Sequence, residues 1–110
     1  MKINKIIFTK EAQKFLSKLD NKVRYKVLYN ADKTKITVDN ELLKKLDGEI
    51  WELRTIYKRL CYRFLCFWDK RDKQNTLVIV THGFLKKTDK TPKEEINKAE
   101  KMRKAYFANK

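Results

Sequence analysis

Apolar residues recur every three or four positions through the first third of the chain, which is the pattern of two amphipathic helices. The first helix is predicted over residues 10–19, with Thr9 as its N-cap, and the second begins after Asp20. The apolar positions of the two stripes are Ala12, Phe15, Leu16, Leu19, Val23, Val27, Leu28 and Ala31. A short strand over residues 2–8 precedes them, and the two helices are expected to pack together as a hairpin.

The period changes to two after Asp47-Gly48, a dipeptide typical of turns. Residues 49–54 alternate between apolar and polar side chains, and residues 60–68 are apolar on both faces except at Arg63. Residues 76–81 form a third run of β-branched and leucine residues. These segments predict an antiparallel meander with a buried central strand. The polar segment 32–41 is a connection of uncertain structure.

A last helix is predicted from Thr91 onward. Thr91 is the expected N-cap, Pro92 occupies the first helical position, and Glu94 follows three residues after the cap. Ile96, Ala99, Arg103 and Tyr106 would then share one face of the helix. The predicted fold is α+β, with a small antiparallel sheet, an N-terminal helical hairpin and a C-terminal helix in the order β-α-α-β-β-β-α. Residues 1–110 are expected to form one domain.

The charge of the chain restricts its partners. It carries 28 Lys and Arg against 14 Asp and Glu, a net charge of +14, and 42% of its residues are hydrophobic. Such an excess favours a polyanionic partner, namely nucleic acid, an acidic protein or an anionic membrane surface, although solvated lysine-rich faces would give the same count. No apolar run is long enough to cross a bilayer or to act as a secretory signal, so a cytoplasmic protein is expected.

The cysteine and histidine content argues against a metal or disulfide framework. Cys61 and Cys66 would lie on opposite faces of one strand, which is poor geometry for a disulfide. With a single histidine, His82, no zinc site is expected. We therefore expect no metal or other cofactor.

Basic and aromatic residues alternate in the middle of the chain. Arg54, Lys58, Arg59 and Arg63 fall in a stretch without acidic residues, together with Tyr57 and Tyr62, and Lys86 and Lys87 follow the last strand. In a meander, Arg54, Arg63, Lys86 and Lys87 could converge on one sheet face. Bases of RNA could stack on Tyr57 and Tyr62, with Lys58 and Arg59 beside them.

Arg63 and His82 each have two interpretations. Arg63 interrupts an apolar strand, so it either pairs with a carboxylate such as Glu52 or faces an anion-binding groove. Cleavage of RNA by its own 2′-hydroxyl needs a base, an acid and positive charge on the phosphate, and arginine and lysine supply the charge. His82 is the only side chain with an ordinary pKa near neutrality, and it serves either proton transfer or a structural hydrogen bond.

Three segments resemble HigB-like toxins of the RelE superfamily, in its phage-derived host-inhibition-like branch. Leu46–Arg54 (LDGEIWELR) is similar to their L-x-G-x-hydrophobic-W-E-L-R stretch, and Tyr62-Arg63 to their Y-R pair on the central strand. His82–Pro92 resembles their H-G-F-x-K-K-T-x-K-T-P run. The resemblance covers about Leu42 to Tyr106.

The resemblance implies a RelE-like microbial ribonuclease fold and a toxin of a type II toxin–antitoxin system. Such toxins are metal-independent endoribonucleases, or mRNA interferases, that cut mRNA on the ribosome and stop translation. The implied partner is a HigA-like antitoxin with a helix-turn-helix domain, through which alone the toxin would meet operator DNA. The catalytic positions carry over to Arg54, Arg63, Lys86 and Lys87, and His82 matches the motif.

Two other functions remain open. The chain is alternatively a non-catalytic basic module that binds RNA or the ribosome, in which case any growth inhibition would leave no new mRNA ends. It is otherwise an inactive toxin remnant, whose expression would be tolerated without an antitoxin.

Overall fold

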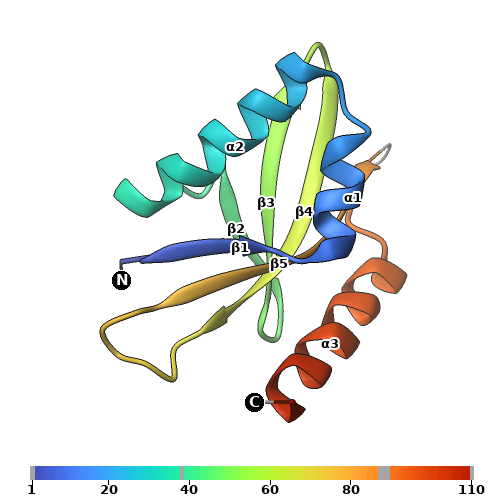
Figure 1. Ribbon diagram of the computed structural model, residues 1–110. Helices are drawn as coiled ribbons and strands as arrows, with labels where there is room; N and C mark the ends of the chain where they lie inside the picture. The colour runs from blue at the N-terminus through green and yellow to red at the C-terminus, as the bar shows by residue number, and fades with distance from the viewer. Residues whose placement is uncertain (1, 38, 87–89, 110) are drawn as a thin grey trace.

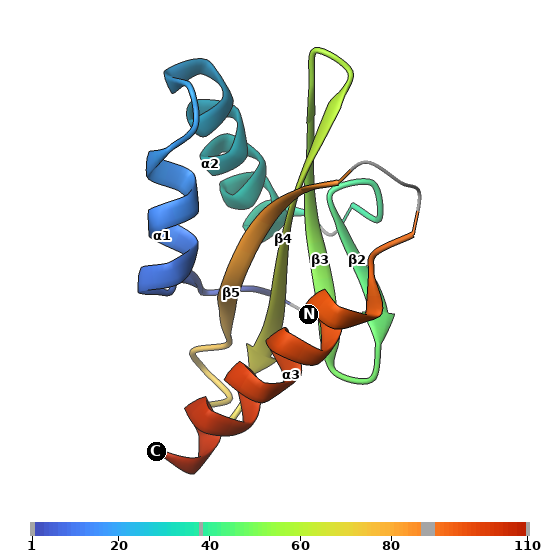
Figure 2. The ribbon, with the colours of Figure 1, turned by 90° about the vertical axis from the view of Figure 1, so that its right-hand side faces the viewer.

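The computed structural model describes residues 2–37, 39–86 and 90–109. Within these residues, one five-stranded sheet in the order β1-β5-β4-β3-β2 lies between two layers of helices (Figures 1 and 2). The elements are β1 (Lys5–Phe8), α1 (Lys10–Ser17), α2 (Asn21–Ile36), β2 (Leu43–Asp47), β3 (Ile50–Tyr57), β4 (Leu60–Asp69), β5 (Leu77–Lys86) and α3 (Lys93–Ala108). The predicted α+β class is confirmed.

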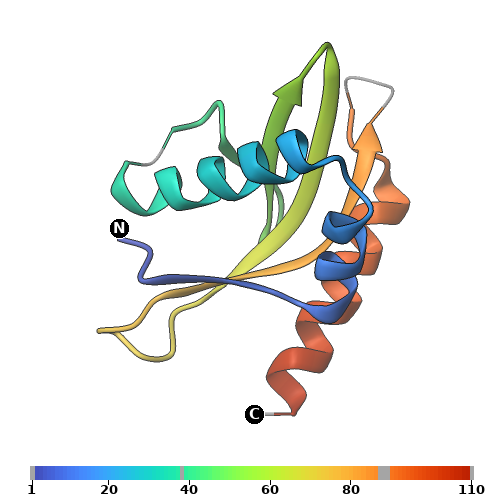
Figure 3. The same cartoon turned by 45° about the horizontal axis from the view of Figure 1, so that its top comes forward.

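Both N-terminal helices form where the apolar stripes predict them. The hydroxyl oxygen of Thr9 accepts a hydrogen bond from the backbone N–H of Ala12 at 3.2 Å, which confirms Thr9 as the N-cap of α1. The helix α2 begins directly after Asp20 and continues to Ile36, so its last five residues belong to the segment 32–41 that the sequence pattern assigned to a connection. The two helices lie on the same face of the sheet, but each packs mainly on the sheet, α1 on β5 and α2 on β3 (Figure 3).

The sheet differs from the sequence prediction at both edges. The segment before the Asp47-Gly48 turn forms β2, an additional strand that pairs antiparallel with β3 and places Leu43 opposite Leu53. At the other edge, β1 runs parallel to β5, so the sheet is mixed rather than wholly antiparallel. The strand predicted over residues 2–8 is confirmed as β1, but its parallel pairing and the strand β2 depend on distant partners, which short segments of weak alternation do not reveal.

The predicted meander of β3, β4 and β5 is confirmed, and its register positions the candidate site. Arg54 on β3 lies opposite Arg63 on β4, and Arg63 lies opposite Phe84 on β5. The strand β5 is longer than predicted. Leu65 pairs with His82 and Cys66 with Val80, so Thr81 is an extra residue on β5 with no partner on β4, as in a β-bulge. Beyond this bulge, β5 continues along β4 to Lys86, which lies opposite Cys61.

The core has two layers, one on each face of the sheet. On the side of α1 and α2, Phe64 and Val80 are fully buried beneath Ala12 and Val27. On the side of α3, Leu65 and Phe67 pack with Ala99. Side chains of β4 thus enter both layers, which explains why this strand is apolar on both faces.

The start of α3 differs from the prediction. The helix begins at Lys93 with Pro92 as its N-cap, so Thr91 lies one residue before the cap. The Thr91 hydroxyl instead donates a hydrogen bond to the Glu52 carboxylate. A buried carboxylate needs hydrogen-bond donors, and the Thr91 hydroxyl supplies one of them to Glu52. No helix in the described part of the chain combines the length and apolar character that a bilayer crossing needs.

Candidate nucleic-acid interface

The face of the sheet that carries α3 is only partly covered. α3 crosses the end of the sheet away from the β3–β4 hairpin (Figure 2), where it packs on Leu65 and Phe67. Nearer the hairpin, Ile56 is 58% exposed and Arg54 is half-buried. We call this part the open face. It consists of Arg54, Ile56, Cys61, Arg63 and Phe84.

Arg63 lies at the inner edge of the open face, held by a buried ion pair. Its Nη1 contacts the Glu52 carboxylate, whose second oxygen accepts the hydrogen bond from Thr91. Glu52 is 0% exposed and Arg63 is 8% exposed. Of the two interpretations of Arg63, pairing with Glu52 is therefore confirmed. Its Nε is also buried, and it has no hydrogen-bond partner among the described residues.

Arg54 is the more accessible of the two arginines. Its Nε donates a hydrogen bond to the backbone carbonyl of Glu41 at 3.2 Å. Among the described residues it forms no salt bridge. Side chains directly opposite on antiparallel strands have Cβ atoms about 5 Å apart, so Arg54 and Arg63 start from neighbouring positions, the first reaching toward Glu41 and the second toward Glu52.

Of the two predicted lysines, Lys86 is the last residue of β5. The backbone of Lys86 pairs with Cys61, so this residue ends the strand beside the open face. Lys87 lies outside the described residues. The register therefore brings the Lys86 position to the same end of the sheet as Arg54 and Arg63.

His82 lies on the same face of the sheet as Phe84, but it is buried against Glu95 of α3 and so is not part of the exposed open face. It is 3% exposed, with Nδ1 3.0 Å from the Thr81 hydroxyl and Nε2 2.9 Å from a Glu95 carboxylate oxygen. Burial lowers the pKa of His82, and the nearby Lys98 acts in the same direction, while the Glu95 hydrogen bond opposes them. The ring is therefore neutral at pH 7. It meets the open face through Phe84, on which it stacks with a centroid distance of 6.0 Å.

Of the residues predicted to contact RNA, three are accessible and one is not. Lys58 and Arg59 form the exposed turn of the β3–β4 hairpin, with φ angles of 49° and 69°. Tyr57 is half-buried on the α2 side of the sheet, with the Lys58 Nζ 5.6 Å from its ring centroid. Tyr62 is 9% exposed and packs in the core beneath α2. Its ring has no free face for a base, so its position does not fit the predicted contact.

Sequence reasoning missed two features of this region. The sequence suggested Glu52 as a partner of Arg63, but it did not suggest that Thr91 also binds the Glu52 carboxylate. Only the tertiary structure brings Thr91 next to β3. It also passed over Tyr25 and Tyr29 on α2, which are 73% and 58% exposed. Their i, i+4 spacing outside the apolar stripe was the available signal.

The cysteines lie as the strand pattern predicts. Cys61 and Cys66 are free thiols on opposite faces of β4. Burial raises the pKa of the Cys66 thiol, so this cysteine is protonated and inert. Among residues 2–37, 39–86 and 90–109, no three metal-binding side chains gather at one point.

A family model with the description "Phage derived protein Gp49-like (DUF891)" matches residues 14–104. The match covers the sheet from β2 to β5, all of α2, most of α3 and half of α1. The chain belongs to this Gp49-like family, which is toxin-like and is associated with toxins of the RelE and HigB types. No curated protein matches the chain significantly.

Proposed function

We propose that this chain is the toxin of a type II toxin–antitoxin system and that it cuts mRNA on the ribosome from the open face. The observation that carries the proposal is the Arg54–Arg63 pair, two like charges directly opposite each other on adjacent strands. Arg63 is already paired with Glu52, whereas Arg54 has no charge partner among the described residues, so an anion bound at this position would compensate the charge of Arg54 beside the Arg63–Glu52 pair. The membership of a toxin-like family and the net charge of +14 support a phosphate as that anion.

The proposal gives each part of the open face a role. Arg54 binds the scissile phosphate, and Arg63, fixed by Glu52, stabilises the charge that develops on it. The buried Nε of Arg63 is a donor that such an anion would satisfy on a small shift of the side chain. Lys86 and Lys87 follow at the end of β5 as further cations. The nucleophile is the 2′-hydroxyl of the RNA, so the step also needs a group that takes its proton and a group that protonates the leaving 5′-oxygen.

The remaining partners follow from the same proposal. A HigA-like helix-turn-helix protein encoded next to the toxin gene neutralises it and carries the complex to operator DNA. The toxin acts in the cytoplasm, where ribosomes are.

One observation favours the second candidate, a basic RNA- or ribosome-binding module without cleavage. The only histidine is buried and hydrogen-bonded on both ring nitrogens. The carboxylate nearest to Arg63 is fully buried. The described open face therefore offers positive charge but no exposed general base.

Induced expression followed by mapping of mRNA 5′ ends separates these candidates. Growth arrest with new ends inside reading frames, relieved by the neighbouring gene, is the result expected of the nuclease toxin. Arrest without new ends would establish the binding module. Tolerated expression of the folded protein would exclude the nuclease toxin and leave the inactive remnant or a binding module that does not affect growth.

Arg54→Gln is the sharpest variant for the site. Because Arg54 is half-buried and outside the buried ion pair, its loss should leave the fold intact. We expect growth inhibition and mRNA cleavage to fall by about 100-fold, the usual cost of one transition-state donor. Lys70→Gln, at the far end of β4, is the matched loss of charge. A folded and fully toxic Arg54→Gln protein would contradict the assignment.

A further inference from the structure

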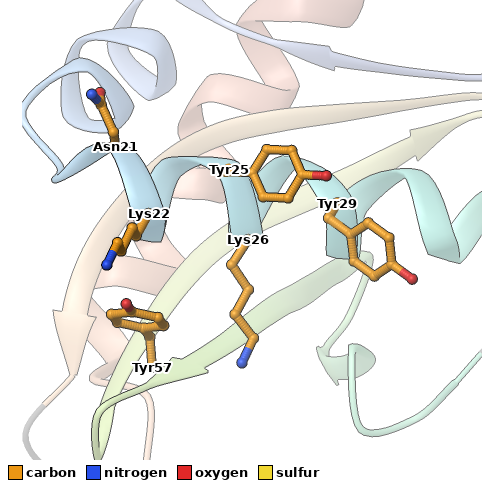
Figure 4. A pocket seen from close by; sticks show the side chains of 6 residues that line it. All are labelled: Asn21, Lys22, Tyr25, Lys26, Tyr29 and Tyr57. Carbon is orange, nitrogen blue, oxygen red and sulfur yellow. The ribbon is translucent and has the colours of Figure 1, made fainter.

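The outer face of α2 carries a groove that the open face does not use. It has a volume of about 530 Å³ and lies between α2 and the end of β3 (Figure 4). Tyr25 and Tyr29 project side by side from α2, and Tyr57 extends from β3 next to Lys22. The lining residues are Asn21, Lys22, Tyr25, Lys26, Tyr29 and Tyr57.

The groove combines aromatic rings with positive charge. The Nζ atoms of Lys26 and Lys58 lie 5.8 and 5.6 Å from the centroid of the Tyr57 ring. None of the described residues that line the groove is acidic. Exposed rings next to uncompensated cations are complementary to a ligand with both flat apolar surfaces and negative charge.

We propose that this groove binds single-stranded RNA, with bases stacked on Tyr25 and Tyr29 and phosphates on Lys22 and Lys26. Residues four apart on a helix are neighbours, with Cβ atoms about 5–6 Å apart, so the two rings are adjacent platforms. Alternating aromatic and cationic side chains are the usual composition of sites for single-stranded nucleic acid.

An acidic protein is the competing occupant, and the distribution of charge disfavours it. The centre of a protein interface is depleted in charged residues, and lysine in particular belongs to its rim. Here the Lys26 side chain extends between the Tyr57 ring and the rings of Tyr25 and Tyr29, rather than around them, and Lys22 lies next to Tyr57 (Figure 4). The observations therefore favour RNA.

The groove extends the site of the proposed function. Tyr57 and Ile56 are consecutive on β3 and point to opposite faces, so the groove and the open face meet at the hairpin turn. A strand bound at Arg54 would cross Lys58 and Arg59 to reach Tyr57. The inference rests on the proposed function for this path, but the binding of RNA to the groove is tested separately.

The test uses a fluorescent 2′-O-methyl oligoadenylate, which cannot be cleaved because its 2′-hydroxyls are blocked, and measures its affinity by anisotropy. Tyr25→Leu/Tyr29→Leu keeps apolar volume but removes the rings, and we expect binding at least tenfold weaker. Tyr25→Phe/Tyr29→Phe keeps the rings and should bind within about twofold of the wild type. Both side chains are exposed, so thermal melts should be unchanged.

Lysine variants test the charge. Lys22→Gln/Lys26→Gln should reduce the slope of log affinity against log salt by about 1.4, at about 0.7 for each phosphate that the protein no longer neutralises. The matched control is Lys70→Gln/Lys73→Gln, which removes the same charge at the opposite end of the sheet. Its slope should stay close to that of the wild type.

Each other outcome overturns the inference. Absence of oligonucleotide binding by the wild type, or unchanged binding by the leucine pair, would show that the groove is not an RNA site. Unchanged RNA binding with lost neutralisation by the neighbouring gene product would make it a protein interface. The two proposals can fail separately. A fully toxic Arg54→Gln protein would contradict the proposed function of the open face, but it would not change the oligonucleotide affinities measured for the groove variants.

Discussion

At the scale of single residues, Glu52 decides the state of the candidate site. It is fully buried, and its two oxygens are taken by Arg63 and Thr91. A buried carboxylate is tolerated only when it is paired and hydrogen-bonded. Glu52 therefore holds Arg63 in one orientation and fixes the segment before α3 to the sheet.

Arg63→Ala should destabilise the protein by about 3–5 kcal/mol, because it leaves a buried carboxylate without its charge partner. The check is urea unfolding followed by circular dichroism. Glu52→Leu/Arg63→Met removes both charges and should recover most of that loss. A folded Arg63→Ala protein as stable as the wild type would show that the pair adds nothing to stability. Because Arg63→Ala is expected to destabilise the fold, a loss of toxicity in this variant would not by itself show that Arg63 acts in catalysis.

Gly83→Ala should also destabilise the fold, by about 1–3 kcal/mol. A Cβ at this position would lie 2.6 Å from a ring carbon of Phe64 on β4 and 2.7 Å from a ring carbon of Phe15 on α1. The same urea experiment measures the change. Replacing Phe15 by Leu in the same chain should return part of the stability, and strictly additive effects would contradict the proposed clash.

At the scale of elements, the β3–β4 hairpin is strained where it is most exposed. Its two turn positions, Lys58 and Arg59, both have positive φ angles, a conformation that suits Asn and Gly far better. Left-handed backbone costs an ordinary residue about 1 kcal/mol. Two long cationic side chains occupy the turn despite that cost, which fits their proposed role in RNA binding.

Lys58→Asn/Arg59→Gly should raise the free energy of unfolding by about 1 kcal/mol or more, while it weakens RNA binding. Thermal melts and oligonucleotide anisotropy measure the two effects. Lys58→Gln/Arg59→Gln loses the same charge without relieving the strain, so it should weaken RNA binding with no gain in stability. Equal stability of the two variants would argue against strain in the turn.

At the scale of the whole molecule, polar contacts at both ends hold α3 on the sheet. Near its start, Glu95 bonds His82, and Lys98 pairs with Glu11 of α1 around the edge of β5. Near its end, the Tyr106 hydroxyl donates to Asp69 at 2.7 Å. The hydrogen bonds from Arg71, followed by that from Tyr106, lower the pKa of Asp69 well below its usual range.

Stability should therefore fall with decreasing pH in two stages. His82 has a lowered pKa in the folded state, so protonation favours the unfolded chain once the pH falls below about 6.5. The contribution of Asp69 is present above about pH 3.9 and is lost as the pH falls further. Urea unfolding between pH 3 and pH 8 measures both stages. His82→Gln should remove the first stage and Asp69→Asn the second, and an unchanged profile in either variant would refute its assignment.

The sequence alone determined the elements whose patterns are local. Apolar periods placed α1, α2, α3 and the meander, Thr9 marked the start of α1, and strand alternation separated Cys61 from Cys66. It also concentrated positive charge around Arg54 and Arg63. Each of these follows from spacing or composition within one segment.

Only the tertiary structure decided what depends on distant partners. The parallel pairing of β1 with β5 and the strand β2 on β3 both depend on distant partners, and Thr91 binds Glu52 instead of capping α3. Burial, which no single segment reveals, closed off Tyr62 and left Tyr25 exposed. The physical reason is that pairing, burial and ion-pair geometry are properties of contacts between segments, whereas periodicity is a property of each segment alone.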